Sequence, residues 1–146
     1  MNSKSILGIG ITLTVMTACS TNPITGRSSL KLANDAEIAT MAAQEYQKTL
    51  TQQKVITGTQ QAKSVTNVGN RIKNAAQAYY RNIGRESDLT HYNWEFKLIE
   101  NKQLNAWCMP GGKVAVYTGI LPVTQNDTGL AVVLGHEVSH ALAGHG

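Results

Sequence analysis

The stretch that decides how the chain is interpreted is Leu130-Ala131-Val132-Val133-Leu134-Gly135-His136-Glu137-Val138-Ser139-His140. Its apolar residues recur at helical spacing. Asn126 or Asp127 can cap the start of such a helix, and Gly144 or Gly146 can end it. The pattern therefore predicts a helix, near the end of this sequence, that carries two histidines and a glutamate.

His136 and His140 are four residues apart, so on a helix they project from one face about one turn apart. Two imidazoles in that arrangement can reach one zinc ion at Zn–N distances of roughly 2.0–2.1 Å. Glu137 lies beside the metal without ligating it, where a carboxylate can move a proton between water and a leaving amine. The apolar stretch before the motif suggests burial, and buried imidazoles need a partner. We therefore predict one zinc ion, bound by the two histidines, with Glu137 as the general base.

A catalytic zinc ion normally has three protein ligands. His145 is the nearest further histidine, but on a continuing helix it would point about 140° away from His140. We interpret it as a polar residue at the helix end. His91, in a polar loop, is a weaker candidate. The motif thus lacks a convincing third ligand within this sequence.

The N-terminus has the pattern of an export signal. Lys4 precedes an apolar run from Ile6 to Ala18, which is shorter than the roughly 20 residues of a membrane-spanning helix. Residues 1–18 are therefore expected to be a signal peptide. Met16-Thr17-Ala18-Cys19 resembles the bacterial lipobox, although Met16 replaces the usual Leu, so we expect a lipid on Cys19. Ordinary signal-peptide cleavage is the alternative, and residues 19–32 are expected to form a tether.

Two helices and three strands are expected before the histidine helix. The first helix starts at Asn34 and runs to about Gln52. A later apolar stripe predicts the second helix, and a polar loop follows at residues 81–91. Both stripes are expected to face the core: Ile38, Met41, Ala42, Glu45 and Tyr46 in the first helix, and Val65, Val68, Ile72, Ala75, Ala76 and Tyr79 in the second.

The three strands are expected at residues 94–99, Leu104–Met109 and Lys113–Thr118, with Pro110-Gly111-Gly112 as the turn between the last two. The fold class is therefore α+β, with two N-terminal helices, a small three-stranded sheet and a C-terminal helix that carries the active site. A length of 146 residues suits one domain of this kind.

Composition excludes some functions. The net charge of +4 comes from scattered Lys and Arg residues, which argues against a nucleic-acid partner. Apart from Cys19, the sequence has one cysteine, Cys108, between Trp107 and Met109. We interpret it as a small buried hydrophobe, because a redox role would need a second thiol nearby.

Two stretches of the sequence resemble a known family. The stretch from Asn105 to Leu121 and the stretch from His136 to Gly146 are similar to the HtpX/BepA/LoiP and Oma-type zinc metallopeptidases. The export signal and residues 19–27 resemble the bacterial lipoprotein members. The resemblance implies a zincin-like (mini-gluzincin) fold, of which residues 33–146 are the N-terminal part. It also implies that the third zinc ligand is a glutamate on a later helix, beyond Gly146, so that the chain is truncated.

In such peptidases the substrate adds a strand to a sheet edge above the zinc ion. The resemblance assigns that role to Gly112, Lys113, Val114, Ala115 and Val116; the alternative is that this strand is interior. The implied function is a zinc metalloendopeptidase that acts on unfolded or misassembled envelope proteins in protein quality control. It would be held by its lipid at the outer membrane, facing the periplasm. The alternative is a catalytically incomplete lipoprotein fragment or a partner-binding remnant without enzymatic activity.

Overall fold

The computed structural model describes residues 19–21, 28–30 and 34–144. The predicted signal peptide, part of the predicted tether and His145 lie outside these ranges. Within the tether, Cys19–Thr21 (β1) and Ser28–Leu30 (β2) pair as antiparallel strands. In the described part of the chain, no helix is both long enough and apolar enough to cross a membrane.

The first two long helices both begin at a capping residue, of which the sequence predicts Asn34 and not Thr59. Helix α1 spans Asp35–Gln52, and the Oδ1 atom of its cap residue Asn34 accepts a hydrogen bond from the Glu37 amide at 2.8 Å. Helix α2 spans Gln60–Asn82, and its cap residue Thr59 accepts one from the amide of Ala62 at 3.1 Å. The prediction of a first helix ending near Gln52 is confirmed.

The predicted apolar stripes of these helices are only partly buried. In α1 Tyr46 is fully buried, whereas Ile38 is 37% and Met41 is 68% exposed. In α2 the buried aromatic residue is Tyr80, and Tyr79, which the stripe predicts to face the core, is 46% exposed. Each helix contacts the sheet along one line, so residues at the margin of a stripe remain in solvent.

The main sheet has four strands rather than the predicted three. They are Val55–Ile56 (β3), Glu95–Ile99 (β4), Ala106–Met109 (β5) and Lys113–Tyr117 (β6), in the spatial order β3-β4-β6-β5. Strand β4 runs parallel to β6, whereas β3 is antiparallel to β4 and β5 is antiparallel to β6. β3 is missing from the prediction because two residues are too few to show a period.

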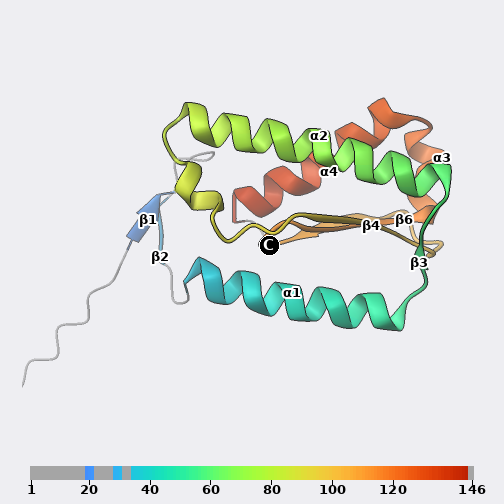
Figure 1. The fold of residues 1–146 in the computed structure, drawn as a ribbon, viewed down its shortest axis with the longest axis horizontal. Helices are drawn as coiled ribbons and strands as arrows, with labels where there is room; N and C mark the ends of the chain where they lie inside the picture. Colours follow the sequence, from blue (N-terminus) through green and yellow to red (C-terminus); the bar gives the residue numbers. More distant parts are fainter. Residues whose placement is uncertain (1–18, 22–27, 31–33, 145–146) are drawn as a thin grey trace, which may run out of the picture.

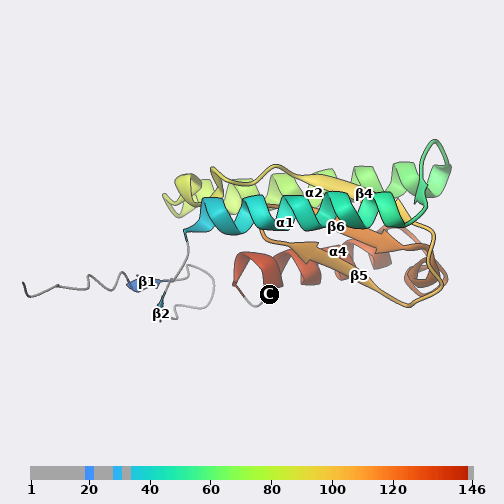
Figure 2. The same cartoon turned by 90° about the horizontal axis from the view of Figure 1, so that it is seen from below.

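The loop between α2 and β4 contains a short 3-10 helix at Glu86–Leu89, labelled η1. After β6 come a 3-10 turn, Thr118–Ile120 (η2), a short helix, Leu121–Thr124 (α3), and the histidine helix, Asp127–Leu142 (α4). Sequence reasoning did not predict η1 or α3. Helix α1 lies on one face of the sheet, and α2 and α4 lie on the other (Figure 1, Figure 2).

Each face of the sheet has its own buried cluster. The α2/α4 face contains Val65, Val68, Phe96, Leu98, Ala106, Val114, Val116, Leu130, Leu134 and Val138. The α1 face contains Tyr46, Ile99, Ala115 and Tyr117, with Trp107 and Met109 packed against them. All five residues of β6 are buried because helices cover both of its faces.

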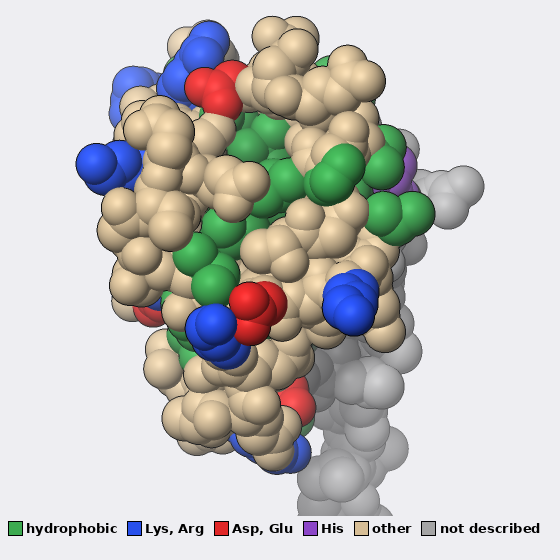
Figure 3. Space-filling model, turned by 90° about the vertical axis from the view of Figure 1, so that its right-hand side faces the viewer, with side chains coloured by type: hydrophobic (Ala, Val, Ile, Leu, Met, Phe, Trp, Pro, Cys, Tyr) green, Lys and Arg blue, Asp and Glu red, His purple; other side chains and the backbone are tan. Residues whose placement is uncertain are grey.

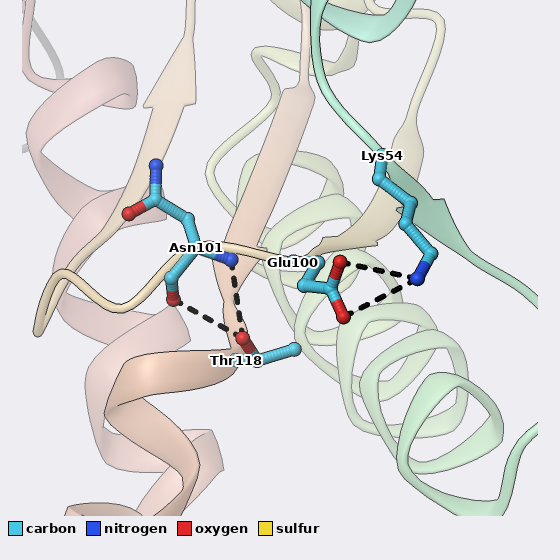
Figure 4. A network of polar contacts seen from close by, with 4 residues as sticks. All are labelled: Lys54, Glu100, Asn101 and Thr118. Carbon is cyan, nitrogen blue, oxygen red and sulfur yellow. Dashed lines mark hydrogen bonds and ion pairs between the residues drawn. The ribbon is translucent and has the colours of Figure 1, made fainter.

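Polar contacts close the end of the sheet at which β4 and β6 finish (Figure 4). The Thr118 hydroxyl donates to the Asn101 carbonyl and accepts from the Asn101 amide, both at 3.1 Å. Beside them, Lys54 and Glu100 form an ion pair at 3.1 Å. These contacts hold the loop after β4 against the end of β6.

Candidate metal centre

Helix α4 presents one face to the core and the opposite face to solvent. Its cap residue Asn126 accepts a hydrogen bond from the Gly129 amide at 3.0 Å, as the sequence predicts. Leu130, Leu134 and Val138, spaced four residues apart, are its buried residues. Gly144, at φ 70°, follows the helix end in the left-handed conformation that glycine adopts without strain.

The two histidines of this helix point at one another. The Nε2 atoms of His136 and His140 are 3.0 Å apart, and their rings lie 4.3 Å apart at an angle of 80°. Both side chains are exposed, because they lie on the face opposite the buried residues. The expectation that the apolar stretch would bury them is therefore wrong for this chain: its apolar residues fill the other side of the helix.

The histidine pair fits a metal ion. Two nitrogen ligands at zinc distances of 2.0–2.1 Å and a tetrahedral angle lie about 3.3 Å apart. The observed separation of the Nε2 atoms is 3.0 Å, within about 0.3 Å of that value. Both rings therefore bring an Nε2 atom to nearly the separation that two nitrogen ligands of one ion would have. A hydrogen bond between the rings is the other arrangement compatible with this distance.

Among residues 34–144 the structure groups no three side chains of the His, Cys, Asp or Glu type that could together hold a metal ion. His91 is exposed in the loop after η1 and joins no such group within that range. His145 lies outside the described residues. The described part of the chain thus brings together two candidate ligands, one fewer than a catalytic zinc ion normally has.

Glu137 is half-buried on α4, and this helix packs against strand β5. The side chain of Cys108 in β5 belongs to the cluster beneath α2 and α4. Burial, and secondarily the charge of Glu137, raise the pKa of the Cys108 thiol to about 12. The carboxylate is therefore close enough to act on this thiol electrostatically. A thiol that stays protonated at neutral pH agrees with the interpretation of Cys108 as a small hydrophobe.

The strand predicted to receive substrate is an interior strand. Residues Lys113–Tyr117 pair with β4 on one side and with β5 on the other, so Lys113, Val114, Ala115 and Val116 have no free edge. The Lys113 ammonium donates to Glu95 Oε1 at 2.8 Å and to the Asn93 carbonyl at 2.6 Å. Gly112, at φ 82°, forms the turn, where a side chain would collide with Trp94. The expectation that this strand offers a free edge is therefore wrong, and a role of these five residues in substrate binding stays a prediction.

Comparison with known protein families gives a match over more than half of the chain. The model of Peptidase family M48 matches residues 62–146, which include most of α2, the sheet beyond β3 and the whole of α4. The chain belongs to this family.

Several M48-type relatives are similar to the chain. The metalloprotease YcaL of Escherichia coli (strain K12) is 29% identical over 148 residues, which covers 99% of this chain and 56% of that protein. The mitochondrial metalloendopeptidase OMA1 of Schizosaccharomyces pombe is 44% identical over 59 residues, 40% of this chain and 18% of the relative. The beta-barrel assembly-enhancing protease of Yersinia pestis is 38% identical over 52 residues, 36% of this chain and 11% of the relative. The chain thus spans at most about half the length of these relatives.

The sequence did not reveal which strand forms the edge of this M48 sheet. β5 and β3 are the two edges, and β5 is the one that packs beneath α4. The turn Pro110-Gly111-Gly112 predicts that β5 and β6 form a hairpin, but it does not say which of them then pairs with β4. That choice depends on the parallel pairing of β4 with β6, which carries no local signal.

Proposed function

We propose that the chain is the N-terminal part of a zinc-dependent metalloendopeptidase that hydrolyses peptide bonds. His136 and His140 would hold one zinc ion, and Glu137 would be the general base. The observation that carries this proposal is the 3.0 Å separation of the two Nε2 atoms, with a carboxylate on the next residue of the same helix. The third ligand would be the glutamate that the family resemblance implies beyond Gly146.

The mechanism assigns one task to each residue of the motif. The imidazoles position the ion, which when bound lowers the pKa of water towards neutrality and polarises the scissile carbonyl. Glu137 accepts the proton of the attacking water and then donates it to the nitrogen of the departing amine. Glu137 is half-buried, so its carboxylate is only partly exposed to bulk water. Val138 and Leu134, fixed in the core, hold the helix that carries all three groups.

The substrate would add a strand to the free edge of β5. β5 pairs with β6 on one side only among the described residues, and it lies next to the helix that carries Glu137. Hydrogen bonding to the main chain of Ala106–Met109 would fix the register of an extended polypeptide with little regard to its sequence. This mode suits unfolded or misassembled proteins, whose backbones are free to pair.

The proposed setting is the bacterial cell envelope, with the lipid on Cys19 as an anchor at the outer membrane. The lipobox-like sequence before Cys19 supports the anchor. The names of the Escherichia coli and Yersinia pestis relatives support proteolysis, and the latter supports a link to envelope protein assembly. Envelope protein quality control is therefore the role that we assign.

A substitution of Glu137 tests the proposal. In a version that carries the complete M48 domain, Glu137→Gln should abolish cleavage of casein while zinc content stays at one ion per chain, because the substitution removes the base and no ligand. Glu100→Gln, a change at an exposed glutamate paired with Lys54, is the matched control and should cleave normally. Casein cleavage by the Glu137→Gln protein at the unsubstituted rate would contradict the assignment.

A second candidate is a partner-binding lipoprotein without enzymatic activity. It is favoured by the observation that residues 34–144 bring together only two histidines at the site. Two ligands bind zinc weakly and leave the ion without the geometry of a catalytic site. Zinc stoichiometry and casein cleavage of a version that carries the complete M48 domain distinguish the candidates: a peptidase shows both, whereas a partner-binding lipoprotein shows neither.

A further inference from the structure

The sheet edge opposite to β5 is only partly covered. β3 pairs Val55 with Ile99 and Ile56 with Leu98 and then ends, although β4 begins three residues earlier, at Glu95. The covered end is held firmly, since the Glu100 amide donates to the Lys54 carbonyl at 2.8 Å beside the ion pair of the two side chains. Past Ile56 the chain turns away towards α2 through Gly58, at φ 74°.

The backbone of Phe96 lies at this uncovered part of the edge. The Glu95 amide donates to the Gly112 carbonyl at 3.0 Å, which is on the β6 side. Successive residues of a strand direct their N–H and C=O groups to opposite sides. Phe96 therefore directs its amide and carbonyl away from β6, beyond the point that β3 reaches. Among the described residues no strand pairs with it there.

A hollow of about 340 Å³ lies beside this edge, between β3, β4 and the first turns of α2. Its lining includes Ile56, Gly58, Lys63, Asn67, Phe96 and Lys97. Figure 3 looks onto this end of the molecule, where hydrophobic side chains form a green band between polar and charged ones. The hollow therefore offers apolar contact next to unpaired backbone groups, which is the combination that strand addition requires.

The charged residues that line the hollow are both lysines, and none of its lining residues is acidic. Within the described ranges neither Lys63 nor Lys97 forms an ion pair. Strand alternation places Lys97 on the sheet face opposite to that of Phe96, whereas Lys63 comes from α2 on the same face as Phe96. A strand added here would thus meet a lysine on each of its faces.

We propose that the β3/β4 edge is a docking site for an extended, acidic polypeptide segment of another protein, which pairs with β4 at Phe96. The segment would supply backbone partners to Phe96 and carboxylates to Lys63 and Lys97. A second copy of this chain fits less well because its net charge is +4. The site lies at the edge of the sheet opposite to β5, so it is separate from the candidate metal centre and from the proposed cleavage edge.

The test uses a short fluorescein-labelled peptide of Val, Thr and Glu, and its counterpart with Lys in place of Glu, titrated with the full chain and read by fluorescence anisotropy. The acidic peptide should bind and the basic one should not. The double variant Lys63→Glu/Lys97→Glu should weaken binding about tenfold or more, since each change replaces an attraction with a repulsion. Lys48→Glu, which changes an exposed lysine on α1, is the matched control and should bind normally.

Two measurements separate strand addition from charge attraction alone. Two peptides are N-methylated at alternate amides, one at the odd and one at the even positions. One of them should no longer bind and the other should bind normally, because only one set of amides faces β4. Asn67→Phe, at an exposed lining residue, should block the hollow and reduce binding.

Equal binding of both N-methylated peptides, or an unchanged affinity of the double variant, would overturn the proposal. So would self-association of the chain through this edge, seen by analytical ultracentrifugation and lost in Asn67→Phe. Because zinc is not required, a failure here leaves the proposed peptidase function untouched.

Discussion

Two glycines inside helices provide a matched pair of substitutions with opposite expected effects. Gly69 lies in α2 and Gly135 lies in α4. In a helix interior, Ala is favoured over Gly by about 1 kcal/mol when its methyl group has room. A methyl group at Gly135 would have Ile72 Cδ1 as its nearest neighbour, at 3.9 Å, which is ordinary contact. Gly135→Ala should therefore raise the free energy of unfolding by about 1 kcal/mol.

At Gly69 the same methyl group would overlap the ring of Phe96. That ring cannot move easily, because it is 8% exposed and stacked on Trp94 with the ring centroids 6.2 Å apart. Overpacking of a core costs about 1–3 kcal/mol, and a ring confined on both sides should lie at the upper end. After subtraction of the helix gain, Gly69→Ala should lower the free energy of unfolding by about 2 kcal/mol.

The two variants should thus differ by about 3 kcal/mol. Urea denaturation followed by far-ultraviolet circular dichroism, without zinc, measures the difference. With a denaturant dependence of about 1–3 kcal/mol per molar, the midpoints should be separated by about 1–3 M. If Gly69→Ala unfolded at or above the midpoint of Gly135→Ala, the close packing of α2 on β4 that underlies the argument would be refuted.

Four further outcomes are expected from buried and half-buried polar groups. Cys108, with its pKa near 12, should react with iodoacetamide at pH 8 about a hundredfold or more slowly in the native chain than in urea, as followed by mass spectrometry of its peptide. Glu137→Gln should speed the native reaction, because loss of the negative charge lowers that pKa. Lys113→Met should reduce the unfolding free energy by about 2 kcal/mol in urea titrations, since it leaves the partly buried carboxylate of Glu95 without its partner. Tyr46→Phe should cost about 1 kcal/mol in the same assay, because the buried hydroxyl loses a hydrogen bond of 3.2 Å to a β6 carbonyl.

Local patterns predicted the helices well. The caps at Asn34 and Asn126 lie where the sequence places them, because a cap is a contact between residues three apart and needs no tertiary partner. The same holds for Pro110-Gly111-Gly112, whose two glycines both have positive φ in the hairpin turn. The sequence predicts the margins of an apolar stripe less accurately than it predicts caps, as Tyr79 and Tyr80 show. The reason is that burial at a margin depends on where the facing sheet ends.

The motif His136-Glu137-Val138-Ser139-His140 is the part of the site that the sequence determined by itself. A spacing of four residues on a helix places the two side chains on one face as neighbours, whatever the rest of the fold does, and here their Nε2 atoms are 3.0 Å apart. The prediction that these imidazoles are buried failed, because helical rotation turns them away from the face that Leu134 and Val138 occupy.

Only the tertiary structure decided which strand is an edge. Strand β6 is an interior strand because β4 pairs with it in parallel, and that pairing joins residues about eighteen positions apart across an intervening strand. Hydrogen bonds between strands involve backbone groups that every residue possesses, so no side-chain pattern reveals the neighbour of a strand. The sequence therefore determined the helix that carries His136 and His140, whereas the positions of β5 beside that helix and of the open edge at β4 were decided by long-range pairing.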